Sequence, residues 1–378
     1  MPLRPRPAVG RMAAVPHGGI NYGELDRLGI APDEVLDFSA NLNPFGPPAG
    51  VTKALGEVDV TRYPDSDSAE FRSVLAKKLG VQPENILAGN GSTEIIRLAA
   101  LGYLGNGDKV FLIEPTFGEY EAACQLAGAT AVKHRLSPED AFLLRMDETL
   151  ALIRQHRPEG IFIGNPNNPT GRCIPRAGLE QVLDSCPESL VVLDEAYISF
   201  VDKGKSCADM LVRDNLLVVR SMTKDYAMPG LRLGYGLADA GIISVLRRLC
   251  PPWNVNALAQ KAGVIALQEE TYLERCQAQL RQAKSYLVHE LSRLGLPPLP
   301  SETNFFLVEV GDAADFRRRL LKRRMLVRDC RSFGLPRFVR IAPRSLADCR
   351  RLVEAIAESR SETSSPLKRG GEGEDRTR

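Results

Sequence analysis

The chain has 378 residues and a formal net charge of +2, so it is long enough for a large core and more than one domain. The nearly balanced charge argues against a protein held to nucleic acid by phosphate contacts, and no apolar stretch is long enough to span a bilayer. The eight cysteines lack metal-like spacing, and the basic start leads into no apolar run that would make a secretory signal. We therefore expect a cytoplasmic protein with reduced thiols and no metal site.

The N-terminal part contains loops that present polar groups. His17-Gly18-Gly19 places a histidine on a flexible turn, where a solvated loop histidine is the commoner interpretation. Asn, Pro and Gly crowd residues 37–46 after a short strand predicted at 35–38, and such a loop fixes the backbone and points amides, including that of Asn41, into a space. Tyr63 follows in the turn Arg-Tyr-Pro-Asp, where a lone tyrosine is normally a surface residue.

Short apolar, β-branched runs then alternate with segments of helical apolar spacing. Strands are expected from Ile86 and at 109–114, 130–134, 160–164, 190–194 and 216–220. Helices are expected at 69–80, 92–104, 117–127, 147–156 and 175–184. Continuous apolar strands bounded by turns are typical of a parallel sheet covered by helices on both faces, in which ligands bind beyond the carboxyl ends of the strands.

Polar and aromatic residues follow these strands at the predicted carboxyl edge. They are Asn90, Gly91, Ser92, Phe117, Asn165, Asp194, Tyr197 and Lys224. Each has an ordinary structural explanation when taken singly: Asp194 as a cap, Asn165 as a turn former and Phe117 as core. Their convergence on one edge favours a common binding site.

Lys224 follows the buried run 216–220, and packing alone rarely explains a lysine there, because burying an ammonium is costly. Burial favours the neutral amine, a usable nucleophile that can form a Schiff base with a carbonyl compound. Pyridoxal phosphate is the commonest carbonyl cofactor, so it is the ligand we expect. The alternative is a surface lysine in a turn.

Two segments are candidates for binding the phosphate of such a cofactor. Ser221 and Arg232 flank the lysine along the chain. The glycine turn at Gly91 begins a helix whose free N–H groups suit a phosphate. An ordinary helix capped by Ser92 or Thr93 is the commoner use of this second pattern.

Other residues at the edge match the ring of pyridoxal phosphate. Asp194 ends an apolar strand, and a buried ionised carboxylate needs a cation, which a protonated pyridine nitrogen supplies. Asn165 and Tyr197 can hydrogen-bond the phenolic oxygen of the ring, and Phe117 can stack on its face.

Beyond residue 239 the pattern changes to helices and then to a smaller α/β unit. Helices are expected at 242–249, 254–269, 271–294, 312–324 and 345–358, and strands at 303–309, 326–329 and 338–341. Arg340 alternates with apolar neighbours in the last strand, so it is expected to point into a cleft, where a guanidinium suits a carboxylate or a phosphate. From Ser359 the chain has no apolar surface to bury and is expected to be a disordered tail.

The order Asn165, Asp194-x-x-Tyr197, Ser221-x-x-Lys224, Arg232, Arg340 resembles that of the fold-type I pyridoxal-phosphate enzymes, aminotransferase class I/II, over roughly residues 17–357. The resemblance implies an α/β fold with a large three-layer αβα domain around a mostly parallel sheet and a smaller C-terminal α/β domain. The expected organisation is a flexible segment 1–16, an arm 17–49 joining the small domain, a large domain 50–269, a small domain 270–358 and a tail 359–378.

The resemblance also implies roles for individual residues. Catalytic roles fall to Lys224, Asp194 and Tyr197, cofactor contacts to Gly91, Ser92, Thr93, Phe117, Asn165, Ser221 and Arg232, and substrate contacts to His17, Asn41, Asn165, Arg328 and Arg340. In this family the site lies between two subunits. A homodimer is therefore expected, with Tyr63 of one subunit reaching the cofactor phosphate of the other.

Two branches of the family look closest, threonine-phosphate decarboxylases of the cobalamin pathway and histidinol-phosphate aminotransferases. Both handle a phosphorylated amine. The chain is more similar to the decarboxylases at His17-Gly-Gly, at residues 37–44 and around Lys224 and Arg328, but it departs at Asp225, where an aromatic residue is expected. A third possibility is a ligand-sensing module of a transcription regulator, which the short segment ahead of His17 disfavours because it leaves no room for a helix-turn-helix.

Overall fold

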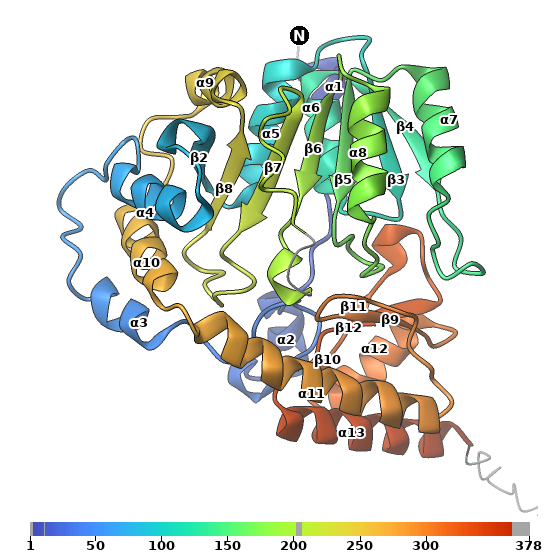
Figure 1. Ribbon diagram of the computed structural model, residues 1–378. Coiled ribbons are helices and arrows are strands. Elements are labelled where there is room, and N and C mark those ends of the chain that lie inside the picture. Colours follow the sequence, from blue (N-terminus) through green and yellow to red (C-terminus); the bar gives the residue numbers. More distant parts are fainter. Residues whose placement is uncertain (1–2, 11, 202–205, 365–378) are drawn as a thin grey trace, which may run out of the picture.

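The computed structural model describes residues 3–10, 12–201 and 206–364. A seven-stranded sheet with the order β2-β8-β7-β6-β5-β3-β4 forms the centre of the large domain (Figure 1). Its strands are β2 (Ile86–Asn90), β3 (Lys109–Glu114), β4 (Thr130–Arg135), β5 (Gly160–Gly164), β6 (Leu190–Asp194), β7 (Leu216–Ser221) and β8 (Leu233–Ala238). The run from β7 to β4 is parallel, while β8 lies antiparallel between β2 and β7. The predicted mostly parallel sheet is thus confirmed.

Helices cover both faces of this sheet (Figure 1). They are α4 (Ala69–Leu79), α7 (Met146–His156), α8 (Arg176–Ser185) and α10 (Ala257–Gln268) on one face, and α5 (Ser92–Tyr103), α6 (Glu119–Ala127) and α9 (Ala240–Leu249) on the other. Along β6, Val191 and Leu193 belong to one core cluster and Val192 to the other. A strand buried on both sides has no polar face, which explains its unbroken apolar sequence.

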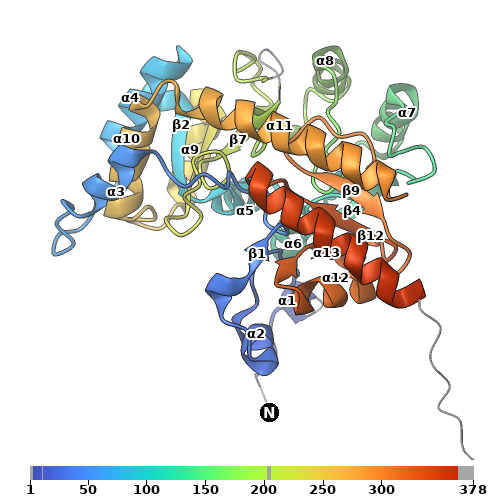
Figure 2. The same ribbon diagram turned by 90° about the horizontal axis from the view of Figure 1, so that it is seen from below.

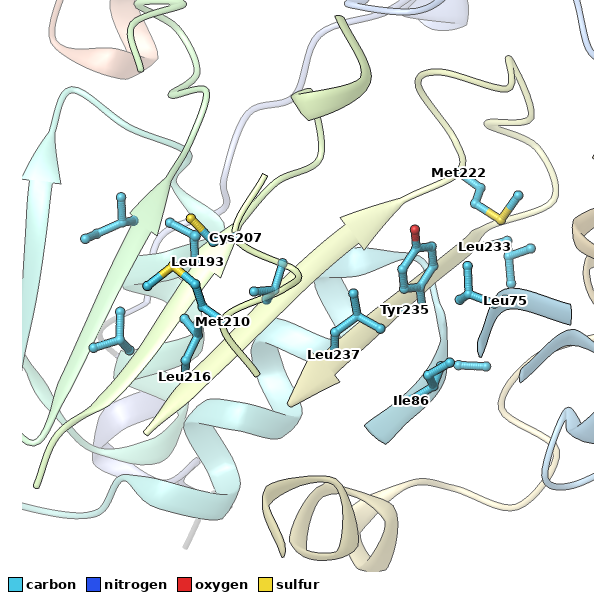
Figure 3. Packing of buried hydrophobic residues seen from close by; sticks show 14 of the residues in the cluster. Leu75, Ile86, Leu193, Cys207, Met210, Leu216, Met222, Leu233, Tyr235 and Leu237 are labelled. Carbon is cyan, nitrogen blue, oxygen red and sulfur yellow. The ribbon is translucent and has the colours of Figure 1, made fainter. Parts of the chain in front are cut away.

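Figure 3 shows one of these cores at close range. Leu193 of β6, Leu216 of β7 and Leu237 of β8 belong to the same cluster as Leu75 of α4, and all four are nearly inaccessible to solvent. Truncating any of them to alanine is expected to cost about 2–5 kcal/mol. A rigid sheet of this kind holds the strand ends, and the residues that follow them, in fixed positions.

The small domain packs three helices on a short sheet. The helices are α11 (Tyr272–Arg293), α12 (Ala313–Lys322) and α13 (Leu346–Ser364), and the sheet has the order β11 (Arg328–Asp329), β12 (Phe338–Ile341), β9 (Phe306–Glu309). Figure 2 shows α11 and α13 side by side across this unit. Phe306, Phe316 and Val339 are buried in its core together with Phe38 of the N-terminal arm.

The N-terminal arm is tied to the small domain by backbone hydrogen bonds. After α2 (Tyr22–Leu28) and the turn η1 (Pro32–Glu34), strand β1 (Leu36–Asp37) pairs in parallel with β10 (Met325–Leu326). The single strand predicted at 326–329 is wrong, because the chain leaves β10 at the fully buried Val327 and enters β11 in the other sheet. This change of sheet places Arg328 beside β12, opposite Arg340.

The remaining elements are short. They are α1 (Pro7–Gly10), α3 (Ala49–Leu55), η2 (Pro83–Asn85), η3 (Ile198–Phe200) and η4 (Arg331–Phe333). Helix α1 contacts α6, and Val15 and Pro16 after it line the outer of the two cavities described below, while the flexibility expected of residues 1–16 stays a prediction.

The C-terminal helix is longer than predicted. Helix α13 continues to Ser364, so the tail expected from residue 359 does not begin there; residues 365–378 of that tail lie outside the described residues. Ser359 is fully buried, and its carbonyl accepts a hydrogen bond from Arg319 Nη1 at 2.9 Å. That contact comes from another helix and has no signature in the local sequence. Among the described residues no helix is sufficiently long and apolar to cross a membrane.

Candidate active site

Two adjoining cavities open at the carboxyl ends of the parallel strands. The inner cavity has a volume of about 70 Å³ and the outer about 860 Å³. The inner wall is formed by Ser92, Thr93, Phe117, Tyr120, Pro166, Asn168, Asp194, Ala196, Tyr197, Ser221, Thr223, Lys224 and Arg232. Most of the residues predicted to bind the cofactor are thus brought together. The predicted substrate residues His17, Asn41, Arg328 and Arg340 line the outer cavity.

Lys224 lies in the turn after β7 and lines both cavities. Its carbonyl accepts a hydrogen bond from the amide of Asn43 at 2.9 Å, which fixes the backbone at this point. Within the part of the chain that the structure describes, its Nζ atom makes no hydrogen bond or ion pair. An amine on a cavity wall with no internal partner is available as a nucleophile to a carbonyl ligand.

Asp194 is the buried carboxyl at the end of β6. Its Oδ2 accepts a hydrogen bond from the Tyr120 hydroxyl at 2.9 Å, and its Oδ1 accepts one from the Ala196 amide at 2.9 Å. Burial raises the pKa of Asp194 to about 6, and these two hydrogen bonds and the charge of Lys224 oppose that rise. A cationic ligand atom at this point would restore the carboxylate.

Tyr120 was not predicted from the sequence. It follows Phe117 by three residues, and the two rings meet edge to face with centroids 5.6 Å apart. Tyr120 lies in the first turn of α6, directly after the loop that carries Phe117, and this closeness in sequence was the signal that could have placed Tyr120 at the same edge.

A second buried carboxyl, Asp225, follows the lysine but lines neither cavity. It accepts hydrogen bonds from the Ser199 hydroxyl at 2.7 Å and the Tyr226 amide at 2.9 Å, and burial raises its pKa to about 6. Here the chain departs from the aromatic residue that the resemblance implies, and the hydroxyl of Ser199 supplies the polar partner that the carboxyl needs.

We expect Asp225→Asn to stabilise the protein in a pH-dependent way. Because the folded state raises the pKa of Asp225, the group contributes its full stability below its ordinary pKa of 3.8 and loses it as the pH rises through about 6. The neutral amide avoids this loss, so the free energy of unfolding should rise by up to about 3 kcal/mol at pH 7.5 and by less than half of that at pH 4.5. Urea unfolding at the two pH values measures the difference. An equal gain at both would show that packing, not charge, is responsible.

The residues predicted to bind the cofactor phosphate gather at the N-terminus of α5. Gly91, with a φ of +78°, is the N-cap and Ser92 the first helical residue, so the side-chain cap expected from Ser92 or Thr93 is absent and the first N–H groups face the cavity end of the helix. A Cβ on Gly91 would lie 2.8 Å from Arg232 Nη2, so glycine is required for the guanidinium to sit beside the helix start. Ser221 contributes a hydroxyl 2.5 Å from that of Thr223, and both line the cavity. Helix N–H groups, hydroxyls and a guanidinium suit a phosphate.

Asn165 does not occupy the position predicted for it. Its Oδ1 accepts a hydrogen bond from the amide of Ile174 at 2.8 Å, its Nδ2 donates to the carbonyl of the same residue at 3.4 Å, and the residue lines neither cavity. Asn168, three residues later, lines both cavities and accepts a hydrogen bond from Arg340 Nη1. The prediction of Asn165 as a cofactor and substrate ligand is therefore wrong, because its amide is used to hold the loop that presents Asn168.

Aromatic rings bound the inner cavity. Phe117 and Tyr197 line it, and Tyr197 is 8% exposed, held edge to face against Phe305 with centroids 4.9 Å apart. The ring of Tyr197 is thus held in place by Phe305, and its contact with the phenolic oxygen stays a prediction.

Arg340 is the buried cation between the two domains, at 5% exposure. Its Nη2 donates to the carbonyl of Ser39 at 2.7 Å, its Nη1 donates to Asn168, and its Nε has no partner among the described residues. Burial lowers the pKa of this guanidinium. A buried, incompletely bonded guanidinium on a cavity wall suits an anionic ligand.

The rest of the outer wall is also rich in donors. Asn41 is 2% exposed and neither atom of its amide has a hydrogen-bond partner among the described residues. Arg328 donates from Nη1 to the carbonyl of His17 at 2.6 Å and from Nη2 to that of Pro16 at 2.8 Å. Burial and the charge of Arg340 lower its pKa. Arg328 therefore fastens the segment ahead of Gly18 to the wall of the outer cavity.

Tyr63 lies away from both cavities. It is 77% exposed and stacks on Trp253 with centroids 4.2 Å apart and an interplanar angle of 16°. Its expected contact with the cofactor of a second subunit stays a prediction.

The residues present fit pyridoxal phosphate. The inner cavity combines an amine without a partner among the described residues, a buried carboxyl whose pKa is raised and a phosphate-type cradle at a helix N-terminus. These three features at the carboxyl edge of an α/β sheet place the protein in the class of pyridoxal-phosphate-dependent enzymes.

The family is shown by comparison with known proteins. The chain belongs to the aminotransferase class I and II family, whose model matches residues 33–356, and its cofactor is pyridoxal phosphate. It is 36% identical over 333 residues to a histidinol-phosphate aminotransferase of Moorella thermoacetica, covering 86% of this chain and 85% of the relative. It is 37% identical over 353 residues to a threonine-phosphate decarboxylase of Salmonella typhimurium, covering 90% of this chain and 95% of the relative. A solved L-threonine-O-3-phosphate decarboxylase of Porphyromonas gingivalis superposes with a TM-score of 0.77 at 28% identity, covering 86% of this chain and 99% of that structure.

Proposed function

We propose that the protein decarboxylates L-threonine O-3-phosphate to (R)-1-amino-2-propanol O-2-phosphate, a step of cobalamin biosynthesis. The observation that carries the proposal is the outer cavity, whose wall offers separate donors for two anionic groups. Arg340 donates to Asn168, which also lines the inner cavity, whereas Arg328, on β11, holds the carbonyl of His17 on the N-terminal segment. A substrate with both a carboxylate and a phosphate matches this arrangement.

The residues of the inner cavity are assigned to the cofactor. Bound there, pyridoxal phosphate supplies an electron sink for the pair left on the substrate Cα when one of its bonds breaks. With the cofactor bound, Asp194 would keep the ring nitrogen protonated, Asn168 and Tyr197 would donate to the phenolic oxygen, and Lys224 would be the covalent attachment point. The amine of Lys224, on the wall shared with the outer cavity, is also placed to return a proton to Cα.

The choice between decarboxylation and transamination is assigned to the outer cavity. The residues of this cavity would select which bond at Cα breaks by fixing the rotation of the substrate. Arg340 holds the carboxylate. Arg328 keeps two of its five N–H groups, Nε–H included, for the substrate phosphate, because three serve the carbonyls of His17 and Pro16 and the hydroxyl of Ser332. When both the carboxylate and the phosphate of the substrate are held, the substrate has only one orientation about Cα.

A histidinol-phosphate aminotransferase is the second candidate, favoured by relatives such as that of Moorella thermoacetica. Incubating the purified holoenzyme with L-threonine O-phosphate, and separately with histidinol phosphate and 2-oxoglutarate, distinguishes the two. We expect release of CO2 and of the amino alcohol phosphate in the first incubation. Formation of a 2-oxo acid from threonine phosphate without CO2, or conversion of 2-oxoglutarate to glutamate with histidinol phosphate as the amino donor, would overturn the decarboxylase in favour of the aminotransferase.

We also propose that the protein works as a homodimer in which Tyr63 completes the cofactor phosphate site of the other subunit. Its 77% exposure and its flat stacking on Trp253 present an aromatic surface with a hydroxyl outward from the chain. The test mixes two variants, Lys224→Ala and Tyr63→Ala, which are each expected to be impaired. In a mixed dimer, one site receives an intact lysine and an intact tyrosine only if the tyrosine acts across the interface. We expect mixing after co-expression to restore activity toward that of one wild-type site; no recovery in isolated mixed dimers would place Tyr63 elsewhere.

A further inference from the structure

One buried carboxylate beside the outer cavity has no role in the proposed reaction. Glu119 is the first residue of α6 and is 5% exposed. Its Oε1 lies 3.1 Å from His17 Nε2, and its Oε2 accepts a hydrogen bond from Arg97 Nη2 at 2.9 Å. All three side chains line the outer cavity. One oxygen of the carboxylate therefore contacts Arg97, a cation on α5, and the other contacts His17 of the N-terminal segment.

His17 is held at two points. Arg328 fixes its carbonyl at 2.6 Å, and Glu119 fixes its imidazole at Nε2. A carboxylate only accepts hydrogen bonds, so Nε2 is the nitrogen that donates to Glu119, and Nδ1 is the nitrogen left for a ligand. The ring centroid lies 5.9 Å from that of Phe117, which also lines the inner cavity.

This arrangement decides what His17 is able to bind. A phosphate dianion offers only acceptors, so Nδ1 must carry a proton to bind one, and the imidazole then has N–H groups on both nitrogens and a positive charge. The carboxylate at Nε2 and the phosphate at Nδ1 both stabilise that cation. Without Glu119, the ring is free to turn and to present an acceptor to the phosphate.

We propose that Glu119 is a positioning residue that makes His17 a donor for the phosphate of the substrate. The proposal rests on the proposed function only in taking the substrate to be a phosphomonoester. The competing interpretation is that Glu119 serves only to join α6 to α5 through Arg97.

The test uses the holoenzyme and three variants: Glu119→Gln, His17→Gln and their combination. Arg97→Gln is the matched control because it breaks the same carboxylate's other contact. We expect Glu119→Gln to raise the KM for L-threonine O-phosphate roughly tenfold with little change in kcat. In the His17→Gln background the same substitution should change KM by less than about twofold, since the group through which it acts is gone. Equal effects in both backgrounds, or an equal rise in KM in Arg97→Gln, would overturn the proposal.

A second readout does not depend on turnover. The chain contains four histidines, so isotope-labelled imidazole signals can be assigned by comparison with His17→Gln. With inorganic phosphate as the probe, the His17 signal should shift in the wild type and in Arg97→Gln but not in Glu119→Gln. A shift of the same size in Glu119→Gln refutes the role of Glu119 and leaves the decarboxylase standing. Conversely, a Glu119-dependent shift in a protein that does not decarboxylate threonine phosphate refutes the proposed reaction and leaves the phosphate site standing.

Discussion

Replacing Lys224 with alanine is expected to abolish turnover and the visible absorbance of the lysine-bound cofactor. The amine has two assigned tasks, covalent attachment and proton return to Cα, and both are lost together. Loss of the proton transfer alone is expected to lower kcat by about 10²–10⁴-fold. Absorbance spectra and single-turnover rates of the purified variant measure the two effects separately.

The structure provides a competing lysine for this assignment. Lys284 is buried against the carbonyls of Ser301 and Thr303, with Nζ to oxygen distances of 2.7 and 2.6 Å, and burial lowers its pKa to about 8. It lines neither of the two cavities. Borohydride reduction of the holoenzyme followed by peptide mapping should find the modified lysine at 224. A modified Lys284, or a visible band that persists in Lys224→Ala, contradicts the assignment.

The carboxyl edge of the sheet was predictable because the end of each strand is visible in the sequence. Continuous apolar runs such as 190–194 and 216–220 stop at a polar residue, and parallel strands deliver those residues to one edge. Asp194 and Lys224 therefore meet without any information beyond strand periodicity. Their placement depends on strands that are buried on both faces, and such strands are visible in the sequence as continuous apolar runs.

Loop geometry was not predictable in the same way. The motif at 165–171 contains two Asn-Pro pairs, and nothing local tells which amide faces the ligand. The chain uses Asn165 to bind its own backbone at Ile174 and presents Asn168 instead. Contacts across long sequence separations, such as Arg328 with the carbonyl of Pro16, depend on the packing of two domains and have no periodic signature.

Substituting Asp194 with asparagine is expected to lower kcat by at least about 100-fold, the usual cost of removing one preorganised electrostatic group. The carboxylate is assigned to keep the cofactor ring nitrogen protonated, and an amide of the same size cannot balance that charge. Because burial raises the pKa of Asp194 to about 6 in the protein alone, the positive ring should pull the carboxyl back to its ionised form. We therefore also expect weaker cofactor retention in the variant, measured by dialysis and absorbance.

Asp225→Asn is the matched control, since it neutralises a buried carboxyl whose pKa is also raised to about 6, one residue from Lys224 but outside both cavities. If kcat depended simply on the number of buried charges around the lysine, the two substitutions would have similar effects. If it depends on a carboxylate that faces the ring, only Asp194→Asn is damaging, and Asp225→Asn retains most of its activity while gaining stability at neutral pH. Equal loss of activity in both variants would mean that the carboxyl at the end of β6 has no special relation to the cofactor.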